Sequence, residues 1–345
     1  MNALVYHGPN QKAWEDKPKP VLRDPTDAVV RVTTSTICGT DLHIMKGDVP
    51  AVTDGRILGH EGVGIVEEVG TGVTQFKKGE RVLISCITSC GKCDYCKKGV
   101  YSHCRTGGWI LGNTIDGTQA QYVRIPHADN SLYHAPEGVA EDALVMLSDI
   151  FPTGFECGVL NGQVKPGDTV AIVGSGPIGL AALLTAQLYS PRCLIMIDQD
   201  ENRLKVALSF GATHTINFKN EKVVDRIQSL TNGEGVDVAI EAVGSPGSFE
   251  TCQTIIAPCG RIANIGVHGT SVQLHLDKLW DRNMTLTTRL VDTVTTPMLL
   301  KMLQSGKLDA KKMVTHSFAL SDVMKAYDTF GNAAKENALK VILKA

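Results

Sequence analysis

The chain has 345 residues, of which 43% are hydrophobic and 20% charged, and its formal net charge is −2. This length favours two domains rather than one, and the near-neutral charge gives no reason to expect nucleic acid or an anionic membrane as a partner. The first residues, MNALVYHGPNQKAW, lack the basic start and long apolar run of a secretory signal. No segment reaches the roughly 20 apolar residues of a membrane-spanning helix. We therefore expect a cytoplasmic protein.

Short strands separated by glycines dominate the first 125 residues. The segments DAVVRVTTSTIC, GVGIVEEVG, GERVLIS and AQYVRIP alternate between apolar and polar residues. This period of two, with turns between the segments, predicts an antiparallel β-rich domain.

From about residue 150 onward, apolar strands alternate with helices. DTVAIVGSGPIGLAALLTAQLY and CLIMIDQDENRLKVALSFGA each have a strand followed by a helix, and the strands GVDVAIEAVG and GRIANIGV flank the helical SFETCQTIIAPC. This alternation predicts a parallel sheet with helices on both faces. After residue 290, two helical segments precede a closing strand, ALKVILK. We predict an α/β protein with a β-rich domain at 1–150, completed by 291–345, and a Rossmann doubly wound parallel sheet at 151–290.

Two motifs in the β-rich part carry potential metal ligands. TICGTDLHIM contains Cys38, and LGHEGVGIVEEVG contains His60 and Glu61. A thiolate and an imidazole are good zinc ligands, and the adjacent carboxylate is a harder donor. A single Cys and a single His are more often core residues. Three features favour a metal site here: glycines flank the His60–Glu61 pair, Thr40 and His43 are close to Cys38 in the sequence, and a dinucleotide-type domain follows.

Four cysteines, Cys90, Cys93, Cys96 and Cys104, occur within SCGKCDYCKKGVYSHC. A disulfide framework is disfavoured because disulfides rarely persist in a reducing cytosol. A bacterial-type iron–sulfur run would continue with x3-Cys-Pro, whereas here the fourth cysteine follows after seven residues. Unliganded core cysteines do not fit the polar residues between them. Four thiolates with no open position are typical of structural zinc.

The segment after residue 170 contains a dinucleotide-binding fingerprint. Gly174, Gly176 and Gly179 form G-x-G-x-x-G between a predicted strand and a predicted helix. Their missing side chains permit a tight turn, close approach of a pyrophosphate and close packing of helix on strand. Pro177 suits the first helical turn. The second strand ends in Asp198, whose carboxylate can accept hydrogen bonds from the adenosine ribose; the alternative is a packing turn followed by a solvated Asp.

Taken together, these motifs resemble the zinc-dependent alcohol dehydrogenases of the medium-chain dehydrogenase/reductase superfamily. The resemblance runs from end to end, and its specific marks are C-G-T-D-x-H, G-H-E-G-V-G-I-V-E-E-V-G, the four-cysteine lobe with x2, x2, x7 spacing, and V-G-S-G-P-I-G. It implies a GroES-like catalytic domain joined to a Rossmann domain. It also implies two Zn²⁺ per chain, one of them a structural zinc in the cysteine lobe.

The resemblance assigns the catalytic zinc to Cys38, His60 and Asp149, with Glu61 able to enter the open position transiently. Asp149, in LSDIFPTGF, stands where Cys2His members have a second catalytic cysteine; Cys157 lies eight residues further on and is expected in the core. The Asp variant resembles the secondary-alcohol and formaldehyde dehydrogenase-like branch. It preserves two anionic ligands. A turn-forming or capping Asp is the alternative interpretation.

The resemblance further implies hydride transfer between a small alcohol and a nicotinamide ring, with zinc making the hydroxyl more acidic. Thr40 would take the hydroxyl proton and pass it through the cofactor ribose to His43, although His43 could also be a plain surface histidine. The substrate pocket is expected to include Thr40, Trp109 and Leu111, although the last two could merely pack. The residues expected to contact NAD are Gly174, Gly176, Pro177, Ile178, Gly179, Asp198, Arg203, Val243, Val267 and Lys340.

The function that we predict is an NAD-dependent alcohol dehydrogenase, homotetrameric or homodimeric, acting on small primary or secondary alcohols and their aldehydes or ketones. A formaldehyde or small-aldehyde dehydrogenase is the second enzyme hypothesis, because SDIFPTG is similar to that branch. A polyol or butanediol dehydrogenase is less favoured, because it would more usually show Glu in place of Asp149. A zinc-lobe binding module is suggested by the lysines around the thiols, but the neutral charge and the complete fingerprint disfavour it.

Overall fold

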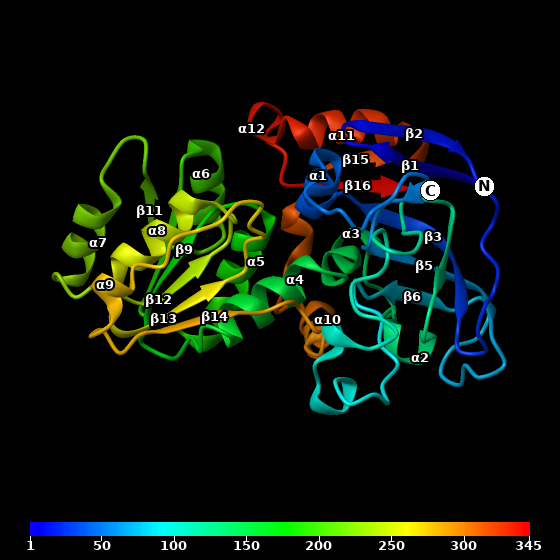
Figure 1. Ribbon diagram of the computed structural model, residues 1–345, viewed down its shortest axis with the longest axis horizontal. Helices are drawn as coiled ribbons and strands as arrows, with labels where there is room; N and C mark the ends of the chain where they lie inside the picture. Colours follow the sequence, from blue (N-terminus) through cyan, green and yellow to red (C-terminus); the bar gives the residue numbers. More distant parts are fainter. The chain divides into compact units, whose positions relative to one another are not determined.

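The computed structural model describes residues 1–345, and its contacts divide the chain into two compact units (Figure 1). Unit 1 comprises Met1–Asp149 together with Asp292–Ala345, and unit 2 comprises Ile150–Val291. These boundaries differ by one residue from those expected. The predicted architecture, a β-rich body interrupted by a parallel-sheet body, is confirmed.

Unit 1 is built on two sheets. One has the strand order β2-β1-β4, and the other has seven strands in the order β15-β16-β3-β5-β6-β8, with β7 also paired to β3. The strands are β1 (Asn2–Gly8), β2 (Gln11–Asp16), β3 (Ala28–Thr36), β4 (Arg56–Ile57), β5 (Gly62–Val69), β6 (Arg81–Ile84), β7 (Tyr122–Ile125), β8 (Leu132–His134), β15 (Val314–Ala319) and β16 (Lys340–Lys344). The pairings are antiparallel except for β15 with β16.

The helices of unit 1 lie between and after these strands. They are α1 (Gly39–Lys46), η1 (Cys96–Lys98), η2 (Tyr101–His103), α2 (Ala128–Ser131), α3 (Glu141–Leu144), η3 (Val145–Leu147), α10 (Thr296–Gln304), η6 (Ala310–Met313), η7 (Leu320–Asp322), α11 (Val323–Gly331) and α12 (Ala333–Glu336). Helix α11 packs on β15, β16 and β2 (Figure 1). Its apolar face joins a core cluster with β1, α1 and β16, so the C-terminal segment completes the N-terminal body.

Unit 2 is a six-stranded parallel sheet in the order β11-β10-β9-β12-β13-β14. Its strands are β9 (Thr169–Val173), β10 (Cys193–Asp198), β11 (His214–Asn217), β12 (Val236–Glu241), β13 (Ile256–Asn264) and β14 (Thr285–Thr288). All five residues of the central strand β9 are buried, as expected for a strand covered on both faces. The topology is that of a Rossmann fold.

The first two helices of unit 2 precede β9, and the others connect the parallel strands (Figure 1). They are α4 (Ile150–Thr153), the π-helix η4 (Gly154–Leu160), α5 (Pro177–Ala186), η5 (Gln187–Tyr189), α6 (Glu201–Ser209), α7 (Val223–Thr231), α8 (Pro246–Ile255) and α9 (Leu276–Leu279). Local chemistry fixes several helix starts: the side chain of Asp200 accepts hydrogen bonds from two amides of α6, and Ser245 caps α8. Helix α8 ends at Ile255, so the IAPC segment that we predicted as helical belongs to β13.

No single helix is both long enough and apolar enough to cross a membrane. One bent pair, Glu141–Leu147 with Ile150–Leu160, meets the criteria of length and composition only.

Candidate metal centre and cofactor site

Four potential metal ligands from three distant segments meet in unit 1. Cys38 precedes the first turn of α1, His60 and Glu61 follow β4, and Asp149 follows η3. One donor atom from each lies within 4.8 Å of the others. The Oδ2 atom of Asp149 is 3.2 Å from Nε2 of His60 and 3.6 Å from Sγ of Cys38. All four side chains are buried.

These distances fit a tetrahedral zinc ion. With bonds of about 2.3 Å to sulfur and about 2.0–2.1 Å to nitrogen and oxygen, tetrahedral ligands lie about 3.3 Å apart for a nitrogen–oxygen pair and about 3.6 Å apart for a sulfur–oxygen pair. Oε1 of Glu61 is buried without a hydrogen-bond partner. An unpaired buried carboxylate oxygen is costly unless a cation or donor faces it. The donor set and its spacing therefore suit zinc.

The electrostatics of the cluster also favour a cation. Burial raises the pKa of the Cys38 thiol and that of the Glu61 carboxyl. Burial lowers the pKa of His60, but its hydrogen bonds with Asp149 and Cys38 outweigh this effect and raise the pKa well above the usual value. The acidic groups beside His60 therefore favour positive charge at this position. A divalent cation bound there would supply that charge and stabilise the anionic ligands.

Asp41 supports two of these ligands, and sequence reasoning did not identify it. Its Oδ2 accepts hydrogen bonds from the backbone N–H of Cys38, at 2.9 Å, and from Nε2 of Gln119, at 3.0 Å. Its Oδ1 lies 4.0 Å from Nδ1 of His60. Tyr327 of α11 donates to Oε1 of Gln119. Such contacts orient metal ligands. The sequence does contain a signal for Asp41. It is the third helical residue after the N-cap Cys38, and an acidic residue at this position of a capping box accepts a hydrogen bond from the N-cap backbone N–H.

Lys340 has buried partners that the sequence analysis did not predict. We assigned it to the cofactor, but its side chain is 1% exposed and its Nζ donates to Oε2 of Glu61 at 2.5 Å and to the carbonyl of Ile37 at 3.1 Å. Burial lowers the pKa of Lys340, but the charge of Glu61, its hydrogen bond with Lys340 and the charges of Cys38 and Asp149 together outweigh this effect and raise the pKa. In this structure, Lys340 is therefore the buried counter-ion of Glu61.

Of the residues expected around the substrate, two lie beside the metal ligands, one is partly exposed and one lies in the core. The Sγ of Cys38 lies 3.8 Å from Oγ1 of Thr40. His43 is partly exposed on α1, and its Nδ1 is 2.9 Å from Oδ2 of Asp48. Trp109 lies edge-on to the His60 ring, with centroids 6.2 Å apart. Leu111, by contrast, has no exposed surface and packs in the core of the β-rich sheet. Our pocket assignment for Leu111 is therefore corrected to a core position.

The four cysteines of the lobe form a second cluster in unit 1. Their sulfur atoms lie within 4.8 Å of one another, and none is in a disulfide. The Sγ atoms of Cys90 and Cys96 are 4.0 Å apart, close to the roughly 3.8 Å between two sulfurs of a tetrahedral zinc site. Backbone N–H groups of Cys96 and Arg105 lower the pKa of Cys93 to about 6, whereas burial raises that of Cys96 to about 12. The lobe fits a closed four-thiolate zinc site.

In unit 2, the three glycines have different surroundings. A Cβ on Gly179 would lie 1.9 Å from the carbonyl oxygen of Gly174, and Gly174 itself has φ +105°. A Cβ on Gly176 would meet only Nη1 of Arg203, at 3.9 Å. Gly179 therefore serves the packing of α5 on β9, whereas Gly176 leaves open space in front of the helix, where a phosphate group could approach.

The other expected cofactor residues lie at the carboxyl ends of the strands of unit 2. Asp198 ends β10, and its two oxygens accept hydrogen bonds from the backbone N–H groups of Ser175, Gln199 and Asp200. Pro177 and Ile178 begin α5. Val243 and Val267 follow β12 and β13 and are about half exposed, at 48% and 54%. Ligands of open parallel sheets bind at this edge.

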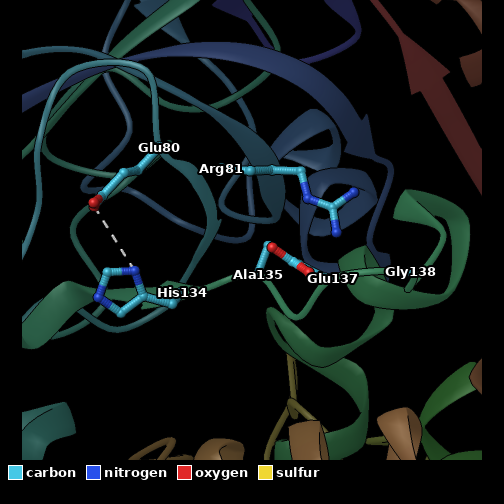
Figure 2. A pocket seen from close by; sticks show the side chains of 6 residues that line it. All are labelled: Glu80, Arg81, His134, Ala135, Glu137 and Gly138. Atoms are coloured by element: carbon cyan, nitrogen blue, oxygen red, sulfur yellow. Dashed lines mark ion pairs between the residues drawn. The ribbon is translucent and has the colours of Figure 1, made fainter.

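A separate surface pocket of about 420 Å³ in unit 1 offers no comparable donor set (Figure 2). Arg81 donates to the carbonyls of Pro136 and Val139 and so anchors the loop beside the pocket. His134 pairs with Glu80 at 3.8 Å and stacks on Phe76. These groups pair with one another rather than converge on a ligand.

Two family models match the chain. The alcohol dehydrogenase GroES-like domain matches residues 24–137, and the zinc-binding dehydrogenase model matches residues 177–305. An alcohol dehydrogenase of Cupriavidus necator is 36% identical over all of this chain and 98% of its own length. The apo structure of zinc dependent alcohol dehydrogenase 2 from Streptococcus pneumonia is 59% identical, with a TM-score of 0.96 over all of this chain and 98% of that one. The chain belongs to the zinc-type alcohol dehydrogenase family of the medium-chain dehydrogenases/reductases.

Two further similar structures contain a bound coenzyme. A dehydrogenase from E. coli CFT073, complexed with NADH, is 26% identical with a TM-score of 0.90, over all of this chain and 99% of that one. A zinc-binding dehydrogenase from Sinorhizobium meliloti 1021, bound to NADP, is 26% identical with a TM-score of 0.88 over the same shares. Family membership makes this chain an oxidoreductase with a GroES-like domain and a Rossmann domain.

Proposed function

We propose that the protein is a zinc-dependent, NAD-linked dehydrogenase that interconverts small primary or secondary alcohols with their aldehydes or ketones. The observation that carries this proposal is the convergence of Cys38, His60 and Asp149 at the spacing of a tetrahedral zinc site. Zinc bound there would act as a Lewis acid that makes the substrate hydroxyl more acidic. The cysteine lobe would hold a second zinc, whose role is to stabilise a loop with little core of its own.

The protein's own residues would position the substrate and carry its proton. Thr40 precedes His43 by three residues on α1, so the two side chains lie on the same face of one helix. We assign the substrate hydroxyl proton to Oγ1 of Thr40, with His43 as the partly exposed residue that would pass the proton to solvent. Trp109, next to the His60 ring, is proposed as a wall of the substrate pocket.

The coenzyme preference follows from Asp198. Its carboxylate is fixed at the end of β10 by three backbone amides, where it can accept hydrogen bonds from a free ribose 2′-hydroxyl but would repel a 2′-phosphate. Two unit charges about 4 Å apart interact by about 4 kcal/mol at an effective dielectric of 20. Arg203 lies near Gly176 and could offset part of this repulsion. We therefore expect NAD to exceed NADP by at least about tenfold in kcat/KM, or about 1.4 kcal/mol.

The deciding experiment is the variant Asp149→Ala. It should lose turnover and one of two zinc equivalents, while NADH binding, measured by fluorescence, stays close to that of the unmodified enzyme. Wild-type activity in this variant would return Asp149 to a capping role. A metal content near one in the fully active unmodified enzyme would contradict the two-zinc proposal.

Substrate assays separate the competing functions. NADH formation from propan-2-ol supports the alcohol dehydrogenase, and turnover of formaldehyde alone supports the aldehyde-directed enzyme. Absence of turnover combined with retention on DNA would support a zinc-lobe binding module. Equal efficiency with NAD and NADP would show that Asp198 does not face the ribose, and Asp198→Gly should narrow the gap between the two coenzymes.

A further inference from the structure

A fifth side chain touches the proposed catalytic zinc site. Cys86 follows β6 and is 3% exposed. Its Sγ lies 3.7 Å from Oδ1 of Asp149, within the range of a thiol-to-carboxylate hydrogen bond. The other oxygen of Asp149, Oδ2, faces Cys38 and His60. The two oxygens of this carboxylate therefore have different partners.

Hydrogen bonds of Ser148 connect the backbone next to Asp149 to Cys86 and to Gly62. The N–H of Cys86 donates to the carbonyl of Ser148 at 3.1 Å. The hydroxyl of Ser148 accepts from the N–H of Gly62 at 3.1 Å and lies 3.2 Å from the Gly62 carbonyl. Asp149 is thus attached on one side to the loop that bears His60 and Glu61, and on the other side to Cys86. The backbone hydrogen bonds fix the position of this segment, and the contact of the Cys86 thiol with Oδ1 bears on the rotation of the carboxylate.

A carboxylate ligand creates a requirement that a thiolate ligand does not have. A carboxylate that binds a metal through one oxygen leaves a second, partly charged oxygen, and at a site this buried that oxygen needs a donor. A cysteine ligand has only one donor atom. If the second oxygen is not held, the carboxylate can rotate and bind through both oxygens. That would occupy the coordination position that a catalytic zinc keeps for substrate.

We propose that Cys86 is a positioning residue that holds Asp149 in one-oxygen coordination, with Oδ2 toward the metal and Oδ1 on the Cys86 thiol. The inference rests on the proposed function, because it takes Asp149 as a zinc ligand. It assigns Cys86 a role outside the four-residue ligand set. It also explains how an aspartate can stand at this position without closing the open site.

The test compares Cys86→Ala, which removes the donor, with Cys86→Ser, which keeps a donor, and with Cys252→Ala as a control. Cys252 is a fully buried thiol in the core of unit 2, in a different hydrophobic cluster. Cobalt exchanged into the more labile metal site reports its coordination number through its visible absorption bands, and Asp149→Ala identifies which bands belong to this site. A chelator then measures the rate of metal release.

We expect the visible cobalt bands of Cys86→Ala to be weaker, because Asp149 would bind through both oxygens and raise the number of ligands from four to five. We also expect the metal to be released faster by roughly 10- to 100-fold. Cys86→Ser and Cys252→Ala should keep the spectrum of the unmodified enzyme. An unchanged cobalt spectrum in Cys86→Ala overturns the inference whatever the release rate, since a packing defect alone could speed release. If Asp149→Ala keeps the same bands, the ligand assignment in the proposed function fails, and the role of Cys86 fails with it.

Discussion

Replacing Lys340 by Met tests how strongly the C-terminal strand depends on the buried ion pair. Methionine retains most of the length of lysine but removes the charge that faces Glu61. The pair has side-chain exposures of 1% and 0%, so water cannot compensate for the missing partner. Glu61 would remain as an uncompensated acid in a site that already raises its pKa through burial.

The expected destabilisation is large. At an N–O distance of 2.5 Å, the gross attraction is about 6–7 kcal/mol at an effective dielectric of 20, and desolvation cancels part of it. Removing one partner of a buried pair typically costs about 3–5 kcal/mol. For a unit of this size each kcal/mol shifts Tm by about 2–4 °C, so the first unfolding transition should fall by roughly 6–20 °C. The deficit should shrink at low pH, where Glu61 becomes protonated and uncharged.

Differential scanning calorimetry of Lys340→Met, Glu61→Gln and the double variant provides the assay. Lys344→Met is the matched control, because Lys344 lies on the same strand but forms a half-exposed pair with Asp142; such pairs contribute at most about 1 kcal/mol. The double variant should be more stable than the sum of the two single effects predicts. A Tm for Lys340→Met within about 2 °C of the unmodified protein, or simple additivity in the double variant, would refute the reasoning.

Three further results are expected. Gly179→Ala should destabilise unit 2 by about 1–3 kcal/mol, because its Cβ would meet a backbone oxygen at 1.9 Å, whereas Gly176→Ala has room and should mainly weaken NADH binding in a fluorescence titration. Cys93→Ser should lower Tm markedly but leave KM nearly unchanged, since the lobe zinc contributes folding energy. An equal decrease in Tm when the unmodified protein is treated with a chelator would identify loss of the metal as the cause. Hydrogen bonds to Asp54 and then Glu15 raise the pKa of His7 from 6.5. His7→Gln should therefore be less stable than the unmodified protein mainly below pH 6.5, and the difference between their Tm values should vanish as the pH rises through the raised pKa. A Tm difference that does not change with pH would exclude this linkage.

The central elements of both units could be predicted from sequence because their patterns are strong. Strand β9 and helix α5 are continuous apolar runs around a glycine turn, and both form as predicted. The prediction missed β11 and β14, whose sequences HTIN and TLTT have few apolar residues. Both are edge strands of the sheet, and they form because a neighbouring strand offers hydrogen bonds. For the same reason, pairing with β12 makes β13 begin at Ile256, in a segment that we predicted as helical.

The candidate site was predictable where the motif itself carries the chemistry. The patterns around Cys38, His60 and the four-cysteine lobe indicated which side chains meet, and the structure brings them together. The supporting residues were not predictable in the same way. Gln119 and Lys340 reach the site through strand pairing and helix packing across large sequence separations, so no local pattern reports them. Leu111 was misplaced because sequence cannot distinguish a pocket wall from the interior of a small β-rich core.

The discontinuity of unit 1 has a consequence for how the protein is made. Strand β16 lies inside the seven-stranded sheet, between β15 and β3, yet it occupies Lys340–Lys344 at the very end of the chain. Unit 2 is one uninterrupted segment and can fold as soon as it has been synthesised. Unit 1 must instead wait, with β3 lacking one of its neighbours and Glu61 lacking its counter-ion, until β16 has been synthesised. Deletion of β16 would leave a finished Rossmann fold attached to a sheet that lacks one of its inner strands.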